Sequence, residues 1–468
     1  MNKCLKILIC LVLSCSLFLT NGSIAETPYS FIETKIETAV RNFLAIPEGN
    51  IMPENLAEVT ELDLWCDEVS DLSDLTMLTN LQKLTLHRVA ENVDISVLAT
   101  LPSLTELNFD GLRVTDISVL SDCTSLQALH FEYSSATDFS PLATLPQLLS
   151  FSLRSNYSTD LSYLNTFPAL TSLHLDFCEV TDISFLCGMN LTDLSVVWCD
   201  NITNLSPIWT LTGLKSLALS GEDELDTNLL AQLTNLETLD LSGYMFSLYP
   251  LEVLPNLHTI IVNEAVVRTA YSDLPALRTL VLKNMNTTND HLSNIAEIPA
   301  LENLELNSCD YISNIDELNN CSNLRSLRLF GCKDLRYIDS LSGLTNLEIL
   351  DVSCFDLEYI YFVTELTNLK ELTLTSTDIT DISVLSQMSN IQTLTLKTYA
   401  TDFSALKDMT SLETLTIDTF NTVKDFSFLA DIPNLRTVYL MDRNVDFSTL
   451  ANLDHLEYLK AGDVVIIR

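Results

Sequence analysis

A leucine-based repeat runs through almost the whole chain and decides what the chain can fold into. Apolar residues recur at positions i, i+3 and i+5, and a new copy of this pattern begins every 20 to 24 residues between Val59 and Leu456. One copy is too short to bury its own apolar face, so successive copies must stack on one another. The 468 residues therefore predict one elongated solenoid rather than several unlike globular domains.

Each repeat combines a strand pattern with a second, outer segment. The Leu-x-Leu alternation places every second side chain on one face, as in a short β-strand. About seven residues later comes a Thr-Asp-Ile-Ser segment, with clear copies at 114–120, 180–186 and 379–385. Its Asp and Ser side chains can accept hydrogen bonds from free backbone N–H groups, which favours a short helical turn. The sequence predicts a curved solenoid with a parallel sheet on its inner side.

These residues resemble the leucine-rich repeats of bacterial internalin-type proteins. Residues 31–64 are also similar to the amino-terminal cap of that family, with an amphipathic helix pattern at Phe31, Ile36, Val40, Phe43 and Leu44. The resemblance implies an α/β solenoid, a leucine-rich repeat horseshoe with a concave parallel sheet, short 3-10 or helical turns on the convex side and a helical cap. It implies a cap over 26–58 and about 19 repeats over 59–468. For function it implies only binding, because this fold serves many unrelated binding tasks.

The amino terminus has the pattern of an export signal. Lys3 and Lys6 precede an apolar stretch from Ile7 to Leu19, and Ser23-Ile24-Ala25 forms a small-x-small cleavage site. We expect removal of residues 1–25 and a secreted or cell-surface location, without a membrane span in the mature chain. Two alternatives remain open, an uncleaved membrane anchor and a lipid-attachment cysteine at Cys15.

Charge excludes whole classes of partner. The chain has 24 Lys and Arg against 63 Asp and Glu, a net charge of −39. Such a chain repels phosphate backbones and anionic lipids, so nucleic acid is not an expected partner. No nucleophile elbow, phosphate-binding loop or zinc-protease motif occurs in the sequence. We therefore expect a protein that is not an enzyme and uses no cofactor or metal.

Cysteine and aspartate each recur in register. Nine cysteines follow the export signal, and we expect them to be reduced core thiols rather than disulfides. Four of them stand at a repeat position where the family usually has Asn, as at Asn156 here: Cys178, Cys199, Cys309 and Cys332. A once-per-coil aspartate predicts caps of the outer turns in preference to a calcium ladder, since no Gly-rich loop accompanies it. The series is Asp71, Asp94, Asp116, Asp138, Asp160, Asp182, Asp381, Asp402, Asp425 and Asp446.

The exposed positions of the strands form the candidate binding face. Aromatic residues and Arg are the types that dominate binding hot spots, and they stand out here among small polar residues. The candidate contact residues are Trp65, His87, His130, His174, Arg328, Phe330, Tyr439 and Met441. His87, His130 and His174 fall on alternate coils, about 10 Å apart, which is too far to share a metal ion.

The predicted function is a monomeric, non-enzymatic protein that presents this face to a protein or glycan partner. A structural or adhesion spacer without a discrete ligand is the first alternative, and an enzyme is the second. Between 221 and 361 the outer segment departs from the Asp-Ile-Ser pattern and the repeat length varies. This irregular region is either a partner site or sequence drift.

Overall fold

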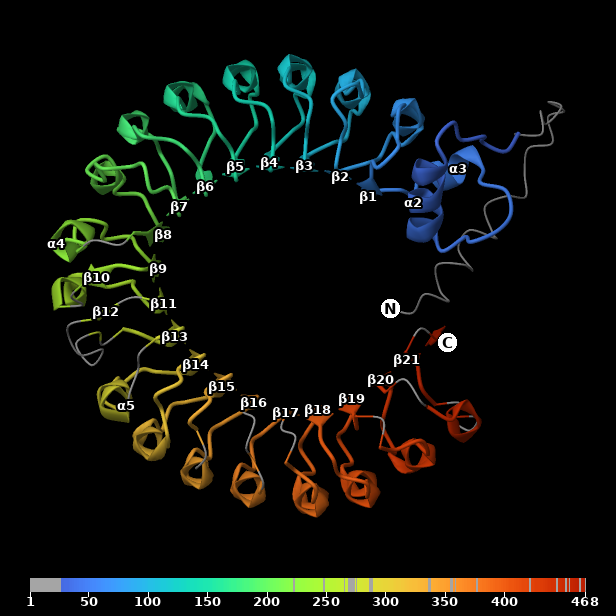
Figure 1. Ribbon diagram of the computed structural model, residues 1–468, viewed down its shortest axis with the longest axis vertical. Helices are drawn as coiled ribbons and strands as arrows, with labels where there is room; N and C mark the ends of the chain where they lie inside the picture. The colour runs from blue at the N-terminus through green and yellow to red at the C-terminus, as the bar shows by residue number, and fades with distance from the viewer. Residues whose placement is uncertain are drawn as a thin grey trace, which may run out of the picture.

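The protein is an open ring of stacked coils, in which the inner wall is a continuous sheet (Figure 1). The computed structural model describes residues 27–467 except 222–223, 247–248, 265, 268–273, 275, 286–288, 336–337, 354–356, 358, 376–377, 421, 443–444, 451–452, 454 and 463. The helical cap and the last strands lie at the two ends of the ring. The export signal, Cys15 and Cys354 lie outside the described residues.

Each coil of the described chain contributes one parallel strand to a 20-stranded sheet, in which the twentieth strand follows the last coil. Neighbouring coils pair in parallel, with each Leu of one strand opposite a Leu or similar residue of the next, as in Leu84 opposite Leu62 and Leu107. The last strand instead turns back and pairs antiparallel with its predecessor. The strands are β1 (Glu61–Trp65), β2 (Lys83–His87), β3 (Glu106–Asp110), β4 (Ala128–Glu132), β5 (Ser150–Arg154), β6 (Ser172–Asp176), β7 (Asp193–Val197), β8 (Ser216–Ser220), β9 (Thr238–Ser242), β11 (Thr259–Asn263), β13 (Thr279–Lys283), β14 (Asn303–Asn307), β15 (Ser326–Phe330), β16 (Ile349–Ser353), β17 (Glu371–Thr375), β18 (Thr393–Lys397), β19 (Thr414–Asp418), β20 (Thr437–Leu440), β21 (Tyr458–Ala461) and β22 (Val464–Ile467).

The outer side of the ring consists mainly of single 3-10 turns, which confirms the predicted helical segments. They are η1 (Ser73–Met77), η2 (Ser96–Thr100), η3 (Ser118–Asp122), η4 (Ser140–Thr144), η5 (Ser162–Thr166), η6 (Ser184–Leu186), η7 (Ile208–Thr210), η8 (Tyr249–Val253), η10 (Asp316–Asn320), η11 (Asp339–Gly343), η12 (Tyr361–Glu365), η13 (Ser383–Gln387), η14 (Ser404–Asp408), η15 (Ser427–Asp431) and η16 (Phe447–Leu450). A wide outer layer and a narrow strand layer give the stack its curvature.

The irregular region replaces some of these turns with other elements. Short α-helices α4 (Thr227–Leu230) and α5 (Asn289–Ala296) stand on the outer side, and β10 (Met245–Phe246) pairs with β12 (Val266–Val267) in a separate two-stranded sheet. The inner sheet continues through this region without interruption, since β9, β11, β13 and β14 pair in order. The sequence irregularity is therefore confined to the outer side of the ring.

Among the described residues, two helices precede the first coil. In α2 (Thr34–Leu44), Ile36 and Val40 are fully buried, and α3 (Pro53–Leu56) follows. Phe43 of the predicted apolar face is instead exposed. The buried face of α2 covers the apolar end of the solenoid at β1, which would otherwise face water.

The repeated aspartates accept hydrogen bonds from the outer turns, which confirms the capping interpretation. The Asp116 carboxylate accepts from the Ser118 N–H at 2.9 Å, and the Asp182 carboxylate accepts from the Ser184 N–H at 2.8 Å. The backbone hydrogen bond from Ser118 lowers the pKa of Asp116. The described residues contain no group of three or more acidic, His or Cys side chains that could hold a metal ion.

We therefore expect Asp182→Ala to lower the free energy of unfolding by about 1 kcal/mol, with no dependence on calcium. Asp116→Ala should act in the same direction. Because the folded pKa of Asp116 is lowered, its stabilisation is present above the ordinary carboxyl pKa of ~3.9 and is lost as the pH falls through the lowered value. Denaturant unfolding with and without calcium measures both effects, and Asp122→Ala, at the exposed end of η3, is the matched control. A calcium-induced stabilisation that these mutations abolish would contradict the capping role.

The eight cysteines that the structure describes are reduced, and among them only Cys187 is exposed. Burial raises the pKa of Cys66 to about 12 and that of Cys123 and Cys321 to about 11, so their reactive thiolate form is scarce at neutral pH. The thiols that stand at the Asn position of the repeat make some of the hydrogen bonds to backbone carbonyls that Asn makes there. Cys199 donates to the Leu175 carbonyl at 3.2 Å, whereas the Asn156 amide donates to two carbonyls, of Ser134 and Ala136.

A thiol reagent should accordingly label the native protein rapidly at Cys187 and label the buried thiols only after unfolding. Peptide mapping of the labelled protein measures this, and Cys187→Ser should remove the rapid phase. Rapid modification of Cys66 or Cys321 in native buffer, or disulfides among the buried positions, would show that the thiols are not held in the core.

Candidate functional site

The inner sheet brings one residue from the centre of every strand into a single column. Parallel pairing without a register shift places His130, Ser152 and His174 side by side, and farther along it places Glu305 next to Arg328 and Arg328 next to Asp351. The residues two positions before or after point to the same face, because side chains alternate along a strand. The predicted concave face is therefore a continuous surface three residues wide, mostly polar but apolar in its central column at Ala218, Ile261 and Val281.

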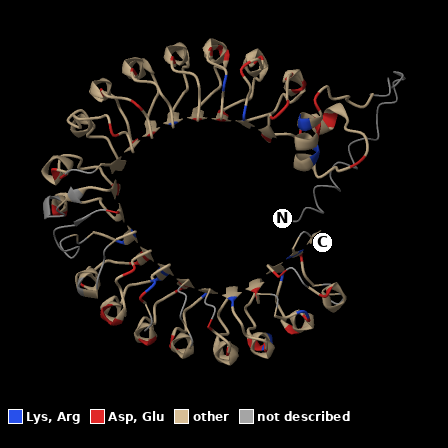
Figure 2. Ribbon diagram, viewed as in Figure 1, with Lys and Arg blue, Asp and Glu red and all other residues tan. Residues whose placement is uncertain are grey.

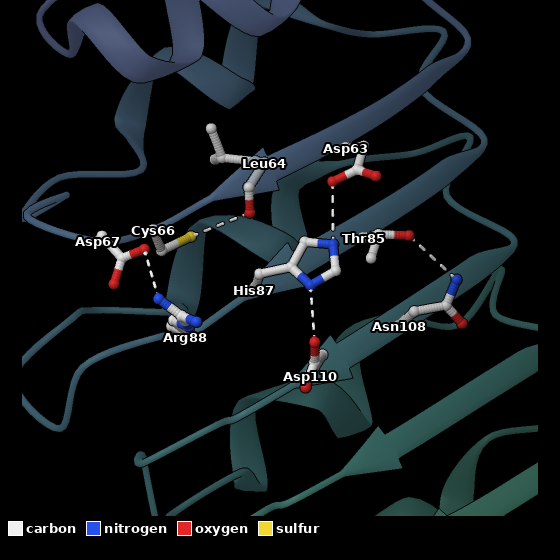
Figure 3. A network of polar contacts seen from close by, with 9 residues as sticks. All are labelled: Asp63, Leu64, Cys66, Asp67, Thr85, His87, Arg88, Asn108 and Asp110. Atoms are coloured by element: carbon white, nitrogen blue, oxygen red, sulfur yellow. Dashed lines mark hydrogen bonds and ion pairs between the residues drawn. The ribbon is translucent and has the colours of Figure 1, made fainter. Parts of the chain in front are cut away.

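At the first coils, an aromatic and ionic cluster organises this face, and Figure 3 shows its polar contacts. The His87 imidazole lies between two carboxylates, with Nε2 3.0 Å from Asp63 and Nδ1 2.9 Å from Asp110. The Trp65 ring stacks on His87 with 4.4 Å between ring centroids and 12° between planes. Trp65 remains 49% exposed. The two carboxylate contacts hold the imidazole in place, and the imidazole in turn supports an exposed indole.

Arg88 completes this cluster from the residue after β2. Its guanidinium carbon lies 5.1 Å from the centroid of the Trp65 ring, a cation–π distance, and it also contacts Asp67 at 3.3 Å. The sequence pattern had singled out Trp65 and His87 but not Arg88, which lies outside the Leu-x-Leu positions. Trp and Arg are both among the residue types that are enriched at binding hot spots.

The other two predicted histidines have different surroundings from His87. His174 lies 2.9 Å from the Asp193 carboxylate and 3.1 Å from the Ser172 hydroxyl, and the bond to Asp193 raises its pKa. Burial lowers the pKa of His130. At pH values near 6.5, therefore, His174 favours the charged form and His130 the neutral form. All three side chains are partly buried rather than fully exposed, because the neighbouring coils flank them.

Arg328 and Phe330 point to the concave face together, as their spacing predicts, while Leu327 and Leu329 are buried. Arg328 and Phe330 are both half-buried. Burial raises the pKa of Asp351 next to Arg328, and the guanidinium opposes that shift. Arg328 also donates to the Ser326 hydroxyl at 3.4 Å. Arg328 is half-buried, whereas the Arg88 side chain is 64% exposed, so Arg328 is less available to a partner than Arg88.

The last predicted contact residues lie near the carboxyl-terminal end of the sheet. The Tyr439 ring lies 5.3 Å from that of Tyr458 on the next strand. Strand β20 ends at Leu440, so Met441 follows it, with 56% of its surface exposed. Strand β20 lies far along the ring from β1 (Figure 1), so the eight predicted residues form separate clusters rather than one site.

A further cluster lies outside the predicted set, at the edge of the ring where strands lead into the outer turns. Tyr133, Tyr157 and Phe177 are 60%, 76% and 48% exposed there. They line a hollow of about 610 Å³ together with Trp198 and polar neighbours. The Leu-x-Leu pattern gives no sign of this hollow, but aromatic residues at the same offset after β4, β6 and β7 could have marked it.

Charge is distributed around the whole ring, with acidic residues on most coils and few basic ones (Figure 2). On the concave side, Lys83 lies between Glu61 at 3.6 Å and Glu106 at 3.3 Å. No helix among the described residues is long and apolar enough to cross a membrane.

Nineteen coils with buried leucines in register, a parallel inner sheet, outer 3-10 turns and a helical cap decide the fold. The chain folds as a leucine-rich repeat protein of internalin-like architecture. The fold class expected from the resemblance is therefore confirmed by the geometry of the chain. No known protein-family model matches the leucine-rich repeat chain, and no curated protein sequence matches it.

Solved leucine-rich repeat structures do match the chain. An internalin (InlF) of Listeria monocytogenes is 22% identical, with 84% of this chain and 98% of that chain covered and a TM-score of 0.33. The functional domain of InlJ from the same organism, which includes a cysteine ladder, is 21% identical, with 86% and 78% covered and a TM-score of 0.40. A plant peptide hormone receptor, RGFR1, is 14% identical, with 88% and 83% covered and a TM-score of 0.37.

Proposed function

We propose that this leucine-rich repeat protein is a non-enzymatic binding protein and that its concave sheet receives a protein partner. The observation that carries the proposal is the cluster of Trp65, His87 and Arg88, in which an exposed indole and a guanidinium are held in place by stacking and ion contacts. A preorganised surface loses little conformational entropy when it binds, so less of the free energy of its contacts is offset by ordering. A spacer without a ligand would not need such a cluster on its inner face.

The partner is expected to carry a basic surface. Asp63 and Asp110 flank His87, Glu61 and Glu106 flank Lys83, and the chain as a whole has a net charge of −39. Complementary charges increase association rates and are screened by salt. Affinity for the partner should therefore fall as the salt concentration rises.

We further propose that residues 1–25 direct export and are removed, that 26–58 form the cap and that the protein acts outside the cell. Lys3, Lys6, the apolar stretch to Leu19 and the Ser23-Ile24-Ala25 site support this. Amino-terminal sequencing of protein recovered from the medium should begin at Glu26. A start at Cys15 or an intact Met1 would refute it.

Trp65→Ala is expected to weaken partner binding by about 2 kcal/mol, roughly 30-fold, with thermal stability nearly unchanged. The partner is captured from cell-surface extract by cross-linking, identified, purified and titrated against each variant by calorimetry. Tyr311→Ala is the control, because Tyr311 is 60% exposed between β14 and η10 and lies off the concave face. Equal affinities for wild type, Trp65→Ala and Arg88→Ala would contradict a contact at this cluster.

The same titration distinguishes a contact at the first coils from one in the middle of the face. The double variant Arg328→Ala/Phe330→Ala removes the middle candidates, and Thr393→Ala/Thr395→Ala removes two concave side chains of matched spacing on β18. A loss of affinity in the Arg328→Ala/Phe330→Ala variant alone would place the partner contact at β15. Loss at none of these positions would refute binding through the concave face.

A further inference from the structure

The hollow at the edge of the ring has the features of a second binding site, separate from the concave face. It lies where β4 to β7 lead into the outer turns and has a volume of about 610 Å³. Four residues occupy the position directly after these strands: Tyr133, Ser155, Phe177 and Trp198. Parallel pairing keeps them in register, so they form one column along the edge.

The backbone at this position is left-handed. The φ angles of Tyr133, Phe177 and Trp198 are 51°, 54° and 55°, a conformation that is unusual for bulky residues. Glycine occupies the same position after β3 and β15, as Gly111 and Gly331, with φ of 82° and 58°. Glycine would avoid the steric strain of about 1–2 kcal/mol per residue. Arg88, Ser155 and Ser308 adopt the same conformation directly after their strands, so the left-handed backbone belongs to the repeat. What distinguishes these coils is that aromatic rings occupy the position.

The column contains a gap the size of one ring. Phe177 and Trp198 stack on adjacent coils with centroids 6.2 Å apart and planes 20° apart. Ser155 occupies the coil between Tyr133 and Phe177, so one aromatic ring is missing from the series. A six-membered ring placed over Ser155 would meet Tyr133 on one side. On the other side it would meet Phe177 together with the Arg154 guanidinium, whose carbon lies 5.8 Å from the Phe177 centroid and which can donate to sugar hydroxyl oxygens. Tyr157 lines the same hollow two residues farther along the chain.

Polar groups border this gap. The Asn201 amide donates to Glu179 at 2.6 Å, which fixes the carboxylate and leaves its other oxygen available. Asp200 and the Ser135 and Ser155 hydroxyls also line the hollow. Carboxylates accept hydrogen bonds from hydroxyl groups, an amide oxygen accepts as well, and serine hydroxyls do both. A planar hydrocarbon ring would leave these groups unpaired, and an anionic ligand would be repelled by a chain of net charge −39.

We propose that this gap binds a neutral sugar ring of a glycan. The C–H faces of the sugar would stack between Tyr133 and Phe177, and its hydroxyls would donate to Glu179 and Asp200. Aromatic walls with a few placed polar groups are the usual composition of a small-ligand site. The site does not depend on the proposed concave function, because none of its residues belongs to the Trp65 cluster.

Saturation-transfer NMR with the intact protein tests the proposal, with neutral tetrasaccharides of glucose, galactose, mannose and N-acetylglucosamine as probes. At least one tetrasaccharide is expected to bind, with the strongest transfer to its ring C–H protons. Ser155→Phe fills the gap with the kind of residue that the adjacent coils already carry in this conformation, and it should weaken binding at least tenfold. Ser308→Phe is the matched control, because Ser308 follows β14 with φ of 53° and should leave binding unchanged.

Tyr133→Gly separates a binding role from a structural one. It removes a wall of the gap while relieving the left-handed strain, so binding should fall at least tenfold while the melting temperature stays the same or rises. Trp65→Ala should leave sugar binding unchanged. Absence of binding to every neutral tetrasaccharide would overturn the proposal, as would sugar binding that survives Ser155→Phe. Tetramethylammonium binding in the gap without sugar binding would also overturn it, by showing a cation site instead.

Discussion

Asp74→Ala is expected to detach the amino-terminal cap and to lower the free energy of unfolding of the cap by about 3 kcal/mol. Asp74 is 1% exposed. Its carboxylate accepts hydrogen bonds from the Tyr29 hydroxyl at 2.7 Å and from the N–H groups of Ile32 and Glu33 at 2.8 Å each. Those two N–H groups lie at the start of α2, where a negative charge also interacts favourably with the helix dipole. Removing the carboxylate leaves all three donors without their charged acceptor.

The contact is reciprocal, which is why its loss should affect the whole cap. The Glu33 carboxylate accepts from the backbone N–H groups of Ser70 and Asp71, at 2.9 and 3.1 Å. Hydrogen exchange of residues 29–44 measures cap opening directly, and it should accelerate in Asp74→Ala far more than in the last coils. Asp74→Asn keeps an acceptor oxygen in a side chain of the same shape, so it should destabilise the cap less than Asp74→Ala does. Unchanged exchange in the cap would contradict this role for Asp74.

Tyr29 adds a pH dependence to the same contact. Burial and the hydrogen bond to Asp74 raise the pKa of Tyr29 to about 12. A group whose pKa is raised in the folded state stabilises that state fully below its ordinary value of ~10 and loses the contribution as the pH rises through 12. Opening of the cap should therefore increase over this alkaline range in the wild type and not in Tyr29→Phe.

The fold could be predicted because every coil contacts mainly its two neighbours. The spacing of Leu62 and Leu64, repeated at Leu84 and Leu86, already defines the strand, its buried face and its pairing partner. The stack of Trp65 on His87 follows from the same register, since the two residues lie opposite each other on β1 and β2. Contacts between neighbouring coils of this kind can therefore be predicted from the repeat pattern alone.

The remaining features depend on contacts that the repeat does not encode. Asp74 binds Tyr29 and Ile32, which are 45 and 42 residues away and outside the repeats. Val97 and Val119 stand at the position of Asp74 in the next two turns, so the buried carboxylate was a visible departure from the apolar pattern. The left-handed backbone at Tyr133 and Phe177 leaves no mark in hydrophobic periodicity. The edge hollow consequently lay outside the predicted site.

Phe131→Ala is expected to lower the free energy of unfolding by about 3–5 kcal/mol. Phe131 is 1% exposed and replaces the second leucine of its repeat. Its ring lies 5.2 Å from that of Phe109, 5.0 Å from that of Phe139 and 6.2 Å from that of Phe151. The cluster therefore joins the coils of β3, β4 and β5 through one side chain, and its removal leaves a cavity among rings that cannot close around it.

Because the phenylalanine cluster lies within a linear stack of coils, the unfolding of Phe131→Ala tests whether the cluster couples the coils on its two sides. In a solenoid the free energy of unfolding is approximately a sum of coil terms and interface terms, so a cavity at β4 weakens the coupling between the two arms of the ring. Urea unfolding followed by tryptophan fluorescence should lose its single transition in Phe131→Ala, because Trp65 reports one arm and Trp209 the other. Phe447→Ala, at a 49% exposed phenylalanine, should stay within about 0.5 kcal/mol of wild type. A single transition with equal losses in both variants would show that the aromatic cluster does not couple the coils, and that each coil is held by its leucines alone.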